Sequence, residues 1–201
     1  MIYIIITACI INKNGVRNKE HRKNRYIECI QQLLTLIDND SSIKPIIVEN
    51  NNNKSYLDDL NCDICYTNNN VHECYHKGVN ELLDIKEVIN RYNIQDNDTI
   101  IKLTGRYKLL DLSFINLIKE NNYDAYIKFF NVCEKSFVFN DCVLGLFAIK
   151  CKYLKNFNYT CIKSPECEFA DYVRKNVNNL MEVKHLNLEC CFADDLRLLI
   201  V

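Results

Sequence analysis

Residues 2–8 (IYIIITA) place the tightest constraint on the fold of this chain. The run is continuously apolar and rich in β-branched side chains, which is typical of a strand buried on both faces of a sheet. Such strands occur almost only where helices cover both sides of a parallel sheet. The rest of the chain alternates helix-like and strand-like segments, as this architecture requires. We therefore predict an α/β fold with a mostly parallel central sheet flanked by helices.

Hydrophobic spacing and turn residues locate the other elements. Helical spacing predicts helices over 26–37, 77–92 and 113–120, and a last helix that begins at Ser164, has Pro165 in its first turn and extends its apolar face to Leu180. Apolar runs predict strands over 46–48, 62–67, 99–103, 125–130 and 143–150, with the tail 187–201 as an edge element. No repeat or linker interrupts the pattern, and 201 residues suit one core, so a single domain over residues 1–201 is expected.

Glycine content and charge exclude several function classes. The four glycines lie tens of residues apart, so the chain holds no G-x-G-x-x-G, no Walker A loop and no G-x-S-x-G elbow. This excludes standard Rossmann dehydrogenases, P-loop NTPases, protein kinases and α/β-hydrolases. The formal net charge of -1 leaves no basic surplus for binding a phosphate backbone, so no nucleic-acid partner is expected.

The apolar N-terminus is too short to cross a bilayer. Residues 1–11 are about half of the roughly 20 that a membrane-spanning helix needs, and no basic region precedes them. We expect no transmembrane segment and no secretory signal. A cytoplasmic location follows, in which the 12 cysteines would be free thiols.

Polar residues follow the predicted strands at the points where ligands of open α/β sheets bind. Thr7 and Ala8 follow the first strand, Glu49 and Asn50 the second, and residues 104–106 (TGR) the fourth. Together they offer backbone amides, short polar side chains and one cation, which could cradle a nucleotide and its phosphates. A purely structural role for these residues stays open, because any parallel sheet ends in polar loops.

Residues 102–107 (KLTGRY) resemble the K-[IL]-T-G-R-Y signature of small glycosyltransferases with the GT-A, or nucleotide-diphospho-sugar transferase, fold, found in bacteria and large DNA viruses. Upstream, residues 76–82 (HKGVNEL) are similar to the N-K-G-x-N-E-L element of the same group, with His in place of the first Asn. Residues 164–166 (SPE) resemble a helix start late in those chains. The resemblance covers most of the chain and is sharpest in the first two segments.

The resemblance implies a Rossmann-like GT-A domain, in the host cytoplasm if the source is viral. It implies transfer of a hexosyl or deoxyhexosyl group from a nucleotide-sugar donor to a glycan or other hydroxyl acceptor. Lys77 and Arg106 would face the diphosphate, where fixed cations stabilise the charge of the leaving group. Two alternative explanations stay open: Lys77 could simply be solvated, and Arg106 could form a structural salt bridge. The predicted donor-binding residues are Thr7, Ala8, Glu49, Asn50, Lys77, Asn80, Lys102, Thr104, Gly105, Arg106 and Tyr107.

A divalent metal, Mn²⁺ or Mg²⁺, is common in GT-A enzymes, where a D-x-D motif holds it on the diphosphate. Residues 96–98 (DND) fit that motif, but they precede the fourth strand instead of following it, so we predict a turn there. The metal ligands therefore stay unknown. The two cations named above could replace the ion, or Asp111 or Asp141 could supply a ligand.

An inverting transferase needs a general base near the acceptor hydroxyl. Glu166 is the first candidate and Glu168 the second, both in the first turn of the last helix. Acids in that turn also complement the helix dipole without catalysis. A retaining mechanism would assign the role differently, so these readings stay open.

A cluster of cysteine and histidine residues has two competing explanations. Cys62 and Cys65, with His72, Cys74 and His76 after them, are spaced like zinc ligands. Side chains three residues apart on a strand point to opposite faces, however, which argues against a zinc site.

Residues 17–25 (RNKEHRKNR) form a basic run that we interpret as the solvated start of the first helix. Arg17 and Arg22 stay secondary donor candidates, since the loop after the first strand closes over the donor in GT-A folds. His21 and His185 are predicted at the surface.

Two other functions stay open. A non-catalytic nucleotide- or glycan-binding domain that retains the fold would explain the missing D-x-D motif and the short chain. A small zinc-stabilised interaction module is the third reading.

Overall fold

The computed structural model describes residues 1–11, 18–38, 40–52, 56–71, 77–129, 140–193 and 195–201. The strands are β1 (Ile2–Ala8), β2 (Ile43–Glu49), β3 (Asp63–Tyr66), β4 (Thr99–Thr104), β5 (Lys108–Leu109), β6 (Ala125–Ile127), β7 (Leu146–Lys150), β8 (Leu180–Glu182), β9 (Leu188–Cys191) and β10 (Leu198–Ile200). The helices are α1 (Lys19–Leu36), α2 (Lys77–Arg91), α3 (Ser113–Glu120), α4 (Cys151–Asn156) and α5 (Pro165–Asn176), with a 3-10 turn, η1, at Asn69–Val71.

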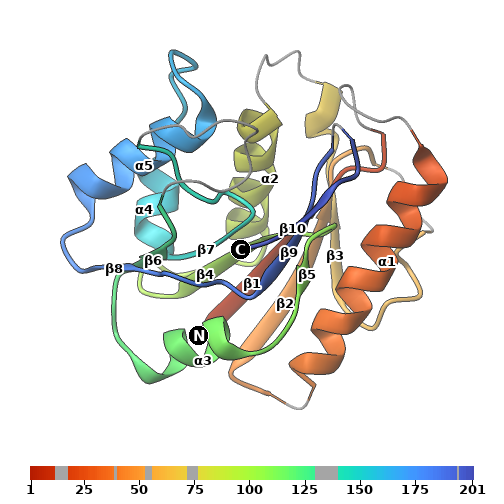
Figure 1. Cartoon of the computed structure of the whole chain (residues 1–201), viewed down its shortest axis with the longest axis horizontal. Helices are drawn as coiled ribbons and strands as arrows, with labels where there is room; N and C mark the ends of the chain where they lie inside the picture. The colour runs from red at the N-terminus through yellow and green to blue at the C-terminus, as the bar shows by residue number, and fades with distance from the viewer. Residues whose placement is uncertain (12–17, 39, 53–55, 72–76, 130–139, 194) are drawn as a thin grey trace.

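The central sheet has seven strands in the order β3-β2-β1-β4-β7-β6-β8 (Figure 1). Strand β1 is parallel to β2 and β4, β2 is parallel to β3, and β6 is parallel to β8. Only β7 runs against its neighbours β4 and β6. The predicted α/β class with a mostly parallel sheet is confirmed. Because β3, β2, β1 and β4 run the same way, their carboxyl ends share one edge.

Helices cover both faces of this sheet, which explains why β1 is apolar throughout. Ile4 and Ile6 pack on the side of α1 and α3, where a second, antiparallel sheet of order β10-β9-β5 also lies. Ile5 packs on the other side, which α2, α4 and α5 cover (Figure 1). Each of the three side chains is at most 1% exposed. The N-terminal strand therefore stands at the centre of two hydrophobic layers.

Helix α1 begins at Lys19, earlier than the predicted start at residue 26. The Asn18 side chain caps it by accepting a hydrogen bond from the His21 N–H at 3.0 Å. The apolar stripe marks only the part of the helix that packs on the sheet. The first turns bury a polar side chain instead, so hydrophobic spacing could not find them.

Short elements account for the other differences from the sequence prediction. Strands β5 and β8 and helix α4 were not predicted, because two to six residues carry too little periodicity. Helix α5 ends at Asn176, and Leu180 opens β8 instead of extending the helix. Strand β2 begins at Ile43, ahead of Pro45.

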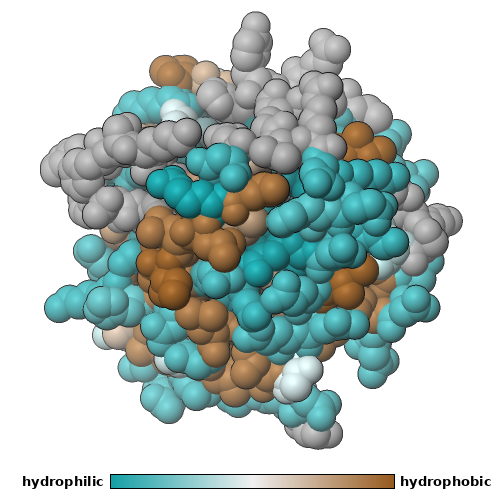
Figure 2. Space-filling model, turned by 45° about the vertical axis from the view of Figure 1, so that its right-hand side comes forward, coloured by the Kyte–Doolittle hydropathy of each residue, from teal (hydrophilic) through white to brown (hydrophobic). Residues whose placement is uncertain are grey.

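The tail forms β9 and β10, which pair antiparallel and join β5 in the second sheet. Leu198, Leu199 and Ile200 of β10 are 52%, 37% and 64% exposed. On the face drawn in Figure 2, apolar residues gather in patches within a largely hydrophilic surface. The tail was expected to form an edge element; β10 is an edge strand, but of a second sheet, and β9 is the central strand of that sheet.

Candidate functional site

A pocket of about 480 Å³ lies at the carboxyl edge of the parallel strands. The ends of β1 and β4 and the first turns of α2 and α5 contribute to its wall. The sequence-predicted site residues that line it are Thr7, Ala8, Asn50, Lys77, Asn80, Lys102, Thr104, Arg106, Tyr107 and Glu166. The fold therefore brings together side chains that are far apart along the chain.

Glu49 and Gly105 do not line this pocket. Glu49 is fully buried, and its carboxylate accepts hydrogen bonds from the Tyr56 hydroxyl and from the Asn51 N–H at 2.9 Å. Burial raises the pKa of Glu49. Gly105 donates its N–H to the Thr7 carbonyl at 2.9 Å, and a Cβ at this position would lie 3.0 Å from the same oxygen. Glu49 thus braces the strand-end loops, and Gly105 lets β4 end close against β1.

The two predicted general bases have different surroundings. Glu166 lines the pocket, whereas Glu168 is turned to the loop that precedes α5. Glu168 accepts hydrogen bonds from the N–H groups of Thr160, Ile162 and Lys163 at 2.6, 2.7 and 3.0 Å. Although desolvation acts to raise the pKa of Glu168, these hydrogen bonds lower it to about 2. A carboxylate held this way is a structural brace and a weak base.

Lys102 and Glu81 form the floor of the pocket. Lys102 is 1% exposed, and its Nζ lies 2.8 Å from Glu81 Oε1, 2.7 Å from Thr104 Oγ1 and 2.6 Å from the Leu144 carbonyl oxygen. Glu81 also accepts a hydrogen bond from the Thr7 hydroxyl at 2.5 Å. Desolvation opposes ionisation of Glu81, but Lys102 and Thr7 hold its pKa below the ordinary value. The Lys102 ammonium is therefore neutralised within the wall.

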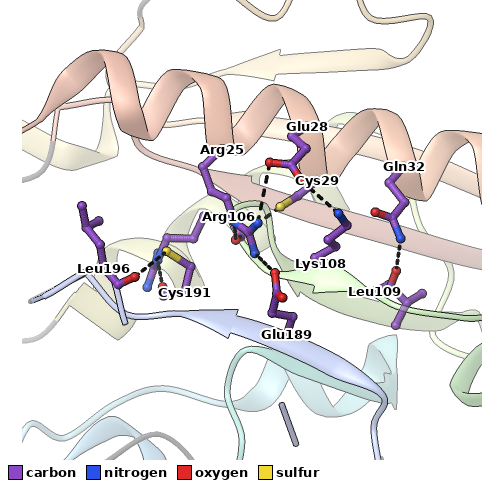
Figure 3. Close-up of polar contacts among 10 residues, drawn as sticks. All are labelled: Arg25, Glu28, Cys29, Gln32, Arg106, Lys108, Leu109, Glu189, Cys191 and Leu196. Carbon is purple, nitrogen blue, oxygen red and sulfur yellow. Dashed lines mark hydrogen bonds and ion pairs between the residues drawn. The ribbon is translucent and has the colours of Figure 1, made fainter. Parts of the chain in front are cut away.

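Arg106 is held in place by β9 and α1 (Figure 3). Its Nε donates to the Cys191 carbonyl on β9 at 2.8 Å. Its own carbonyl accepts from Arg25 Nε at 3.1 Å and Cys29 Sγ at 3.4 Å, both on α1. The guanidinium carbon lies 5.0 Å from the centre of the Tyr107 ring.

The charge of Arg106 persists in this enclosed position. Desolvation acts to lower the pKa of Arg106, but Tyr107, Tyr26 and Glu81 leave it raised. Within the described part of the chain, no carboxylate forms an ion pair with this guanidinium. Arg106 is thus a fixed cation on the pocket wall.

Arg22 lies on the same wall, and its interpretation as a solvated residue is wrong. Its side chain is 4% exposed, and its Nε and Nη2 donate to the Cys9 carbonyl at 3.3 and 2.9 Å. Nη2 also lies 3.1 Å from the Tyr26 hydroxyl. The signal in the sequence is the four-residue spacing to Tyr26, which puts both residues on one helix face. Arg17 lies outside the described residues.

Asp84 is a pocket residue that sequence reasoning missed. It is fully buried and accepts hydrogen bonds from Thr67 Oγ1 at 2.7 Å, Asn69 Nδ2 at 2.8 Å and Asn50 Nδ2 at 2.9 Å. Burial raises the pKa of Asp84 to about 6. The signal was an acid next to Ile85 on the buried face of a helix, where a charge requires partners.

The first turns of α2 and α5 meet at the pocket. A Cβ on Gly78 would lie 2.7 Å from Cβ of Pro165, so the two helices touch there. Lys77 is exposed at the start of α2, and Ser164 caps α5 by accepting from the Cys167 N–H at 3.3 Å. Helix N-termini carry partial positive charge and unpaired N–H groups. Their convergence favours an anionic ligand.

The D-x-D segment lies away from the pocket, as the turn prediction requires. Asp98 accepts hydrogen bonds from the Gln95 N–H and from the N-terminal amine, both at 3.0 Å. Asp96 pairs with Lys155 at 2.6 Å. Asp111 accepts from the Ser113 N–H at 2.8 Å, so of the two alternative acids only Asp141 lines the pocket.

The residues that the structure describes do not form a metal site. Among them, no group of three or more His, Cys, Asp or Glu side chains could hold an ion. Cys62 is half-buried and Cys65 is buried, both as free thiols, and the other three residues of the zinc hypothesis lie outside the described ranges. His21 and His185 are exposed, as predicted. In the same described ranges, every helix is too short or too polar to cross a membrane.

Comparison with known proteins supports the fold. No family model and no curated protein matches the sequence. Among solved structures, galactosyltransferase LgtC, in complex with donor and acceptor sugar analogues, superposes with a TM-score of 0.50 at 8% identity, covering 90% of this chain and 73% of that one. A 4-diphosphocytidyl-2C-methyl-D-erythritol synthase gives a TM-score of 0.56 at 9% identity, and the match covers 92% of this chain and 90% of that one.

The S. aureus protein TarS (1–349), in complex with UDP-GlcNAc, gives a TM-score of 0.56 at 10% identity, with 90% of this chain covered. This chain spans 55% of that structure. At such identities the similarity shows the fold alone: a GT-A-like α/β architecture, as the sequence predicted.

Proposed function

We propose that this chain is a glycosyltransferase that moves a hexosyl or deoxyhexosyl group from a nucleotide-diphospho-sugar to a hydroxyl of a glycan or another acceptor. Residues 1–201 would form one catalytic domain. The observation that carries the proposal is a pocket at the carboxyl edge of the parallel strands, where the fixed guanidinium of Arg106 and the N-termini of α2 and α5 meet.

The diphosphate of the donor would occupy this positive part of the pocket. Arg106 and Lys77 supply charge, and the first turns of α2 and α5 supply unpaired N–H groups. As the bond to the sugar breaks, the leaving diphosphate gains negative charge, which prearranged donors stabilise. Arg106 is already held by Cys191, so little rearrangement is needed.

The nucleoside would lie at the ends of β1 and β2. Thr7, Ala8 and Asn50 line the wall there, and Asn80 joins them from α2. The Lys102–Glu81 pair supports the floor beneath them.

Glu166 would act as general base in an inverting transfer. Its carboxylate takes the proton of the acceptor hydroxyl while that oxygen bonds to the anomeric carbon. The bond from this carbon to the diphosphate breaks, and its electron pair leaves with the diphosphate. The position of Glu166 on the pocket wall supports this role, because Glu168 is occupied by the loop before α5.

The test is binding of UDP-, GDP-, CMP- and dTDP-sugars, followed by their hydrolysis without acceptor. A ligand that binds only the native state raises the unfolding temperature. We expect a selective shift that Arg106→Ala abolishes. Lys155→Ala, which removes a cation paired with Asp96 away from the pocket, is the matched control and should keep the shift.

The outcomes separate the candidate functions. Binding together with hydrolysis that Glu166→Gln lowers supports the transferase. Selective binding with no hydrolysis or transfer above background supports the non-catalytic nucleotide-binding domain. If no nucleotide-sugar binds, both are contradicted.

A further inference from the structure

Two residues of the pocket wall keep a buried polar atom without a partner. Within the described residues, Arg22 Nη1 and Asn50 Oδ1 have no hydrogen-bond partner, although the residues are only 4% and 6% exposed. A buried polar atom without a partner is costly, so such atoms on a pocket wall point to a ligand. One is a donor and the other an acceptor.

The acceptor on Asn50 is fixed by Asp84. Asn50 Nδ2 donates to Asp84 Oδ2 at 2.9 Å, while Asp84 Oδ1 accepts from Thr67 and Asn69 at 2.7 and 2.8 Å. An ionised carboxylate only accepts, so the amide of Asn50 must turn its NH₂ toward Asp84. Its oxygen is thereby left for the ligand.

The donor on Arg22 is fixed in the same way. Its Nε and Nη2 are bound to the Cys9 carbonyl, and Nη2 also contacts the Tyr26 hydroxyl. The planar guanidinium cannot turn without breaking these contacts. Nη1 is therefore the remaining donor, on a residue that also lines the pocket.

We propose that the base of the donor is uracil and that Asn50 and Arg22 recognise it by hydrogen bonds. Asp84 is the positioning residue that orients the Asn50 amide. This rests on the proposed function. The ring N3–H would donate to Asn50 Oδ1, and a neighbouring carbonyl would accept from Arg22 Nη1. Uracil offers one N–H beside carbonyl groups, which matches one acceptor and one donor.

Other bases match these two atoms less well. Cytosine, adenine and guanine each carry an exocyclic amino group with two N–H donors. The Asn50 amide offers one acceptor, and the Asp84 oxygens behind it are already hydrogen-bonded. In cytosine and adenine the ring nitrogen beside the amino group carries no hydrogen and would face Asn50 Oδ1 as a second acceptor, which disfavours these bases. Guanine has an N1–H beside a carbonyl, and the GDP measurement below tests it.

The first experiment tests the ligand and needs no variant. Affinities of UDP, CDP, GDP and 3-methyl-UDP for the intact chain are measured by calorimetry at pH 7.5. UDP is expected to bind at least tenfold more tightly than CDP or GDP. 3-Methyl-UDP lacks the N3–H and is expected to lose at least tenfold, whereas 5-methyl-UDP keeps the N3–H and should bind within a few-fold of UDP.

The second experiment tests Asp84 through base preference. In Asp84→Asn the new amide can accept as well as donate, so the amide of Asn50 can turn and present Nδ2. The ratio of UDP to CDP affinity should fall at least tenfold. Glu87→Gln, the same change on the exposed part of α2, should leave the ratio unchanged.

Each result decides the inference. Equal affinities for UDP and 3-methyl-UDP, or wild-type preference for CDP or GDP, would overturn the uracil assignment while leaving the transferase proposal intact. An equal loss of UDP and CDP in Asp84→Asn would make Asp84 merely structural. Failure of all five nucleotides to bind would contradict the proposed function itself.

Discussion

Lys102 on β4 and Glu81 on α2 form an ion pair of 2.8 Å on the floor of the pocket. Lys102 is almost fully enclosed, whereas the Glu81 side chain keeps 27% exposure toward the pocket. The pair joins a helix to the strand next to β1, and Arg22, Lys77 and Arg106 also line the pocket as cations. The energetic coupling between Lys102 and Glu81 can therefore be tested by substitution.

We expect Lys102→Met to lower the free energy of unfolding by about 3 kcal/mol, because it leaves the Glu81 carboxylate without its buried partner. The double variant Lys102→Met, Glu81→Gln should recover more than half of this loss, since Gln can still accept from Thr7. Urea unfolding of the three proteins measures both effects. Equal stability of the single and double variants would show that the pair is not coupled.

Gly145 makes room for Tyr107. A Cβ on Gly145 would lie 2.2 Å from Cε2 of the Tyr107 ring, on the pocket wall. Gly145→Ala should therefore lower the free energy of unfolding by about 1–3 kcal/mol through overpacking. In a double-mutant cycle with Tyr107→Ala, the two losses should be less than additive. Full additivity would contradict the contact.

Glu166 and Glu168 offer a matched comparison of two acids in one helical turn. Glu166→Gln should lower kcat by about 10²–10⁴-fold, the range for loss of a general base, with little change in stability. Glu168→Gln should leave kcat within a few-fold. Steady-state transfer rates for the two variants, measured with one donor and acceptor, check this. The reverse pattern would exchange the roles.

The stability contribution of Glu168 should depend on pH. Because its pKa is about 2 in the folded chain and ordinarily near 4.5, its contribution is present above the ordinary value and is lost as the pH falls toward 2. Urea unfolding of wild type and Glu168→Gln should differ at pH 6 and converge in acid. A difference in unfolding free energy that stays constant with pH would show that the charge of Glu168 does not contribute to stability.

The contribution of Asp84 to the free energy of unfolding should change with pH in the opposite direction. Its pKa of about 6 in the folded chain exceeds the ordinary value of 3.8, so between these values the folded chain binds more protons than the unfolded chain. The unfolding free energy of wild type relative to Asp84→Asn should therefore fall as pH rises from 4 to 6, and then level off. A flat or rising difference would contradict the burial of an ionisable Asp84.

Several features followed from the sequence alone, because they depend on local pattern. The unbroken apolar run of β1 required helices on both faces of a sheet, and Ser164 with Pro165 marked the start of α5. Carboxyl ends of parallel strands meet at one edge, so the positions of Thr7, Asn50 and Arg106, at or just after the ends of three predicted strands, placed them near each other. The pocket contains all three.

Only the tertiary structure decided which polar side chains face that pocket. Glu49 ends β2 and Asn50 follows it, yet Glu49 is enclosed by Tyr56 and the loop after β1. Arg22 belongs to a basic run that looks solvated, yet the Cys9 carbonyl binds it in the wall. Local periodicity carries no information about such partners.

The physical reason is that side-chain direction at the end of a strand or helix is set by groups distant in sequence. Arg106 is oriented by the carbonyl of Cys191, 85 positions away, and Asn50 by the carboxylate of Asp84, 34 positions away. Burial makes each of these polar contacts obligatory, because an unpaired group would lose its hydration without compensation. The sequence thus determined where the site lies, and long-range hydrogen bonds decided which atoms it presents.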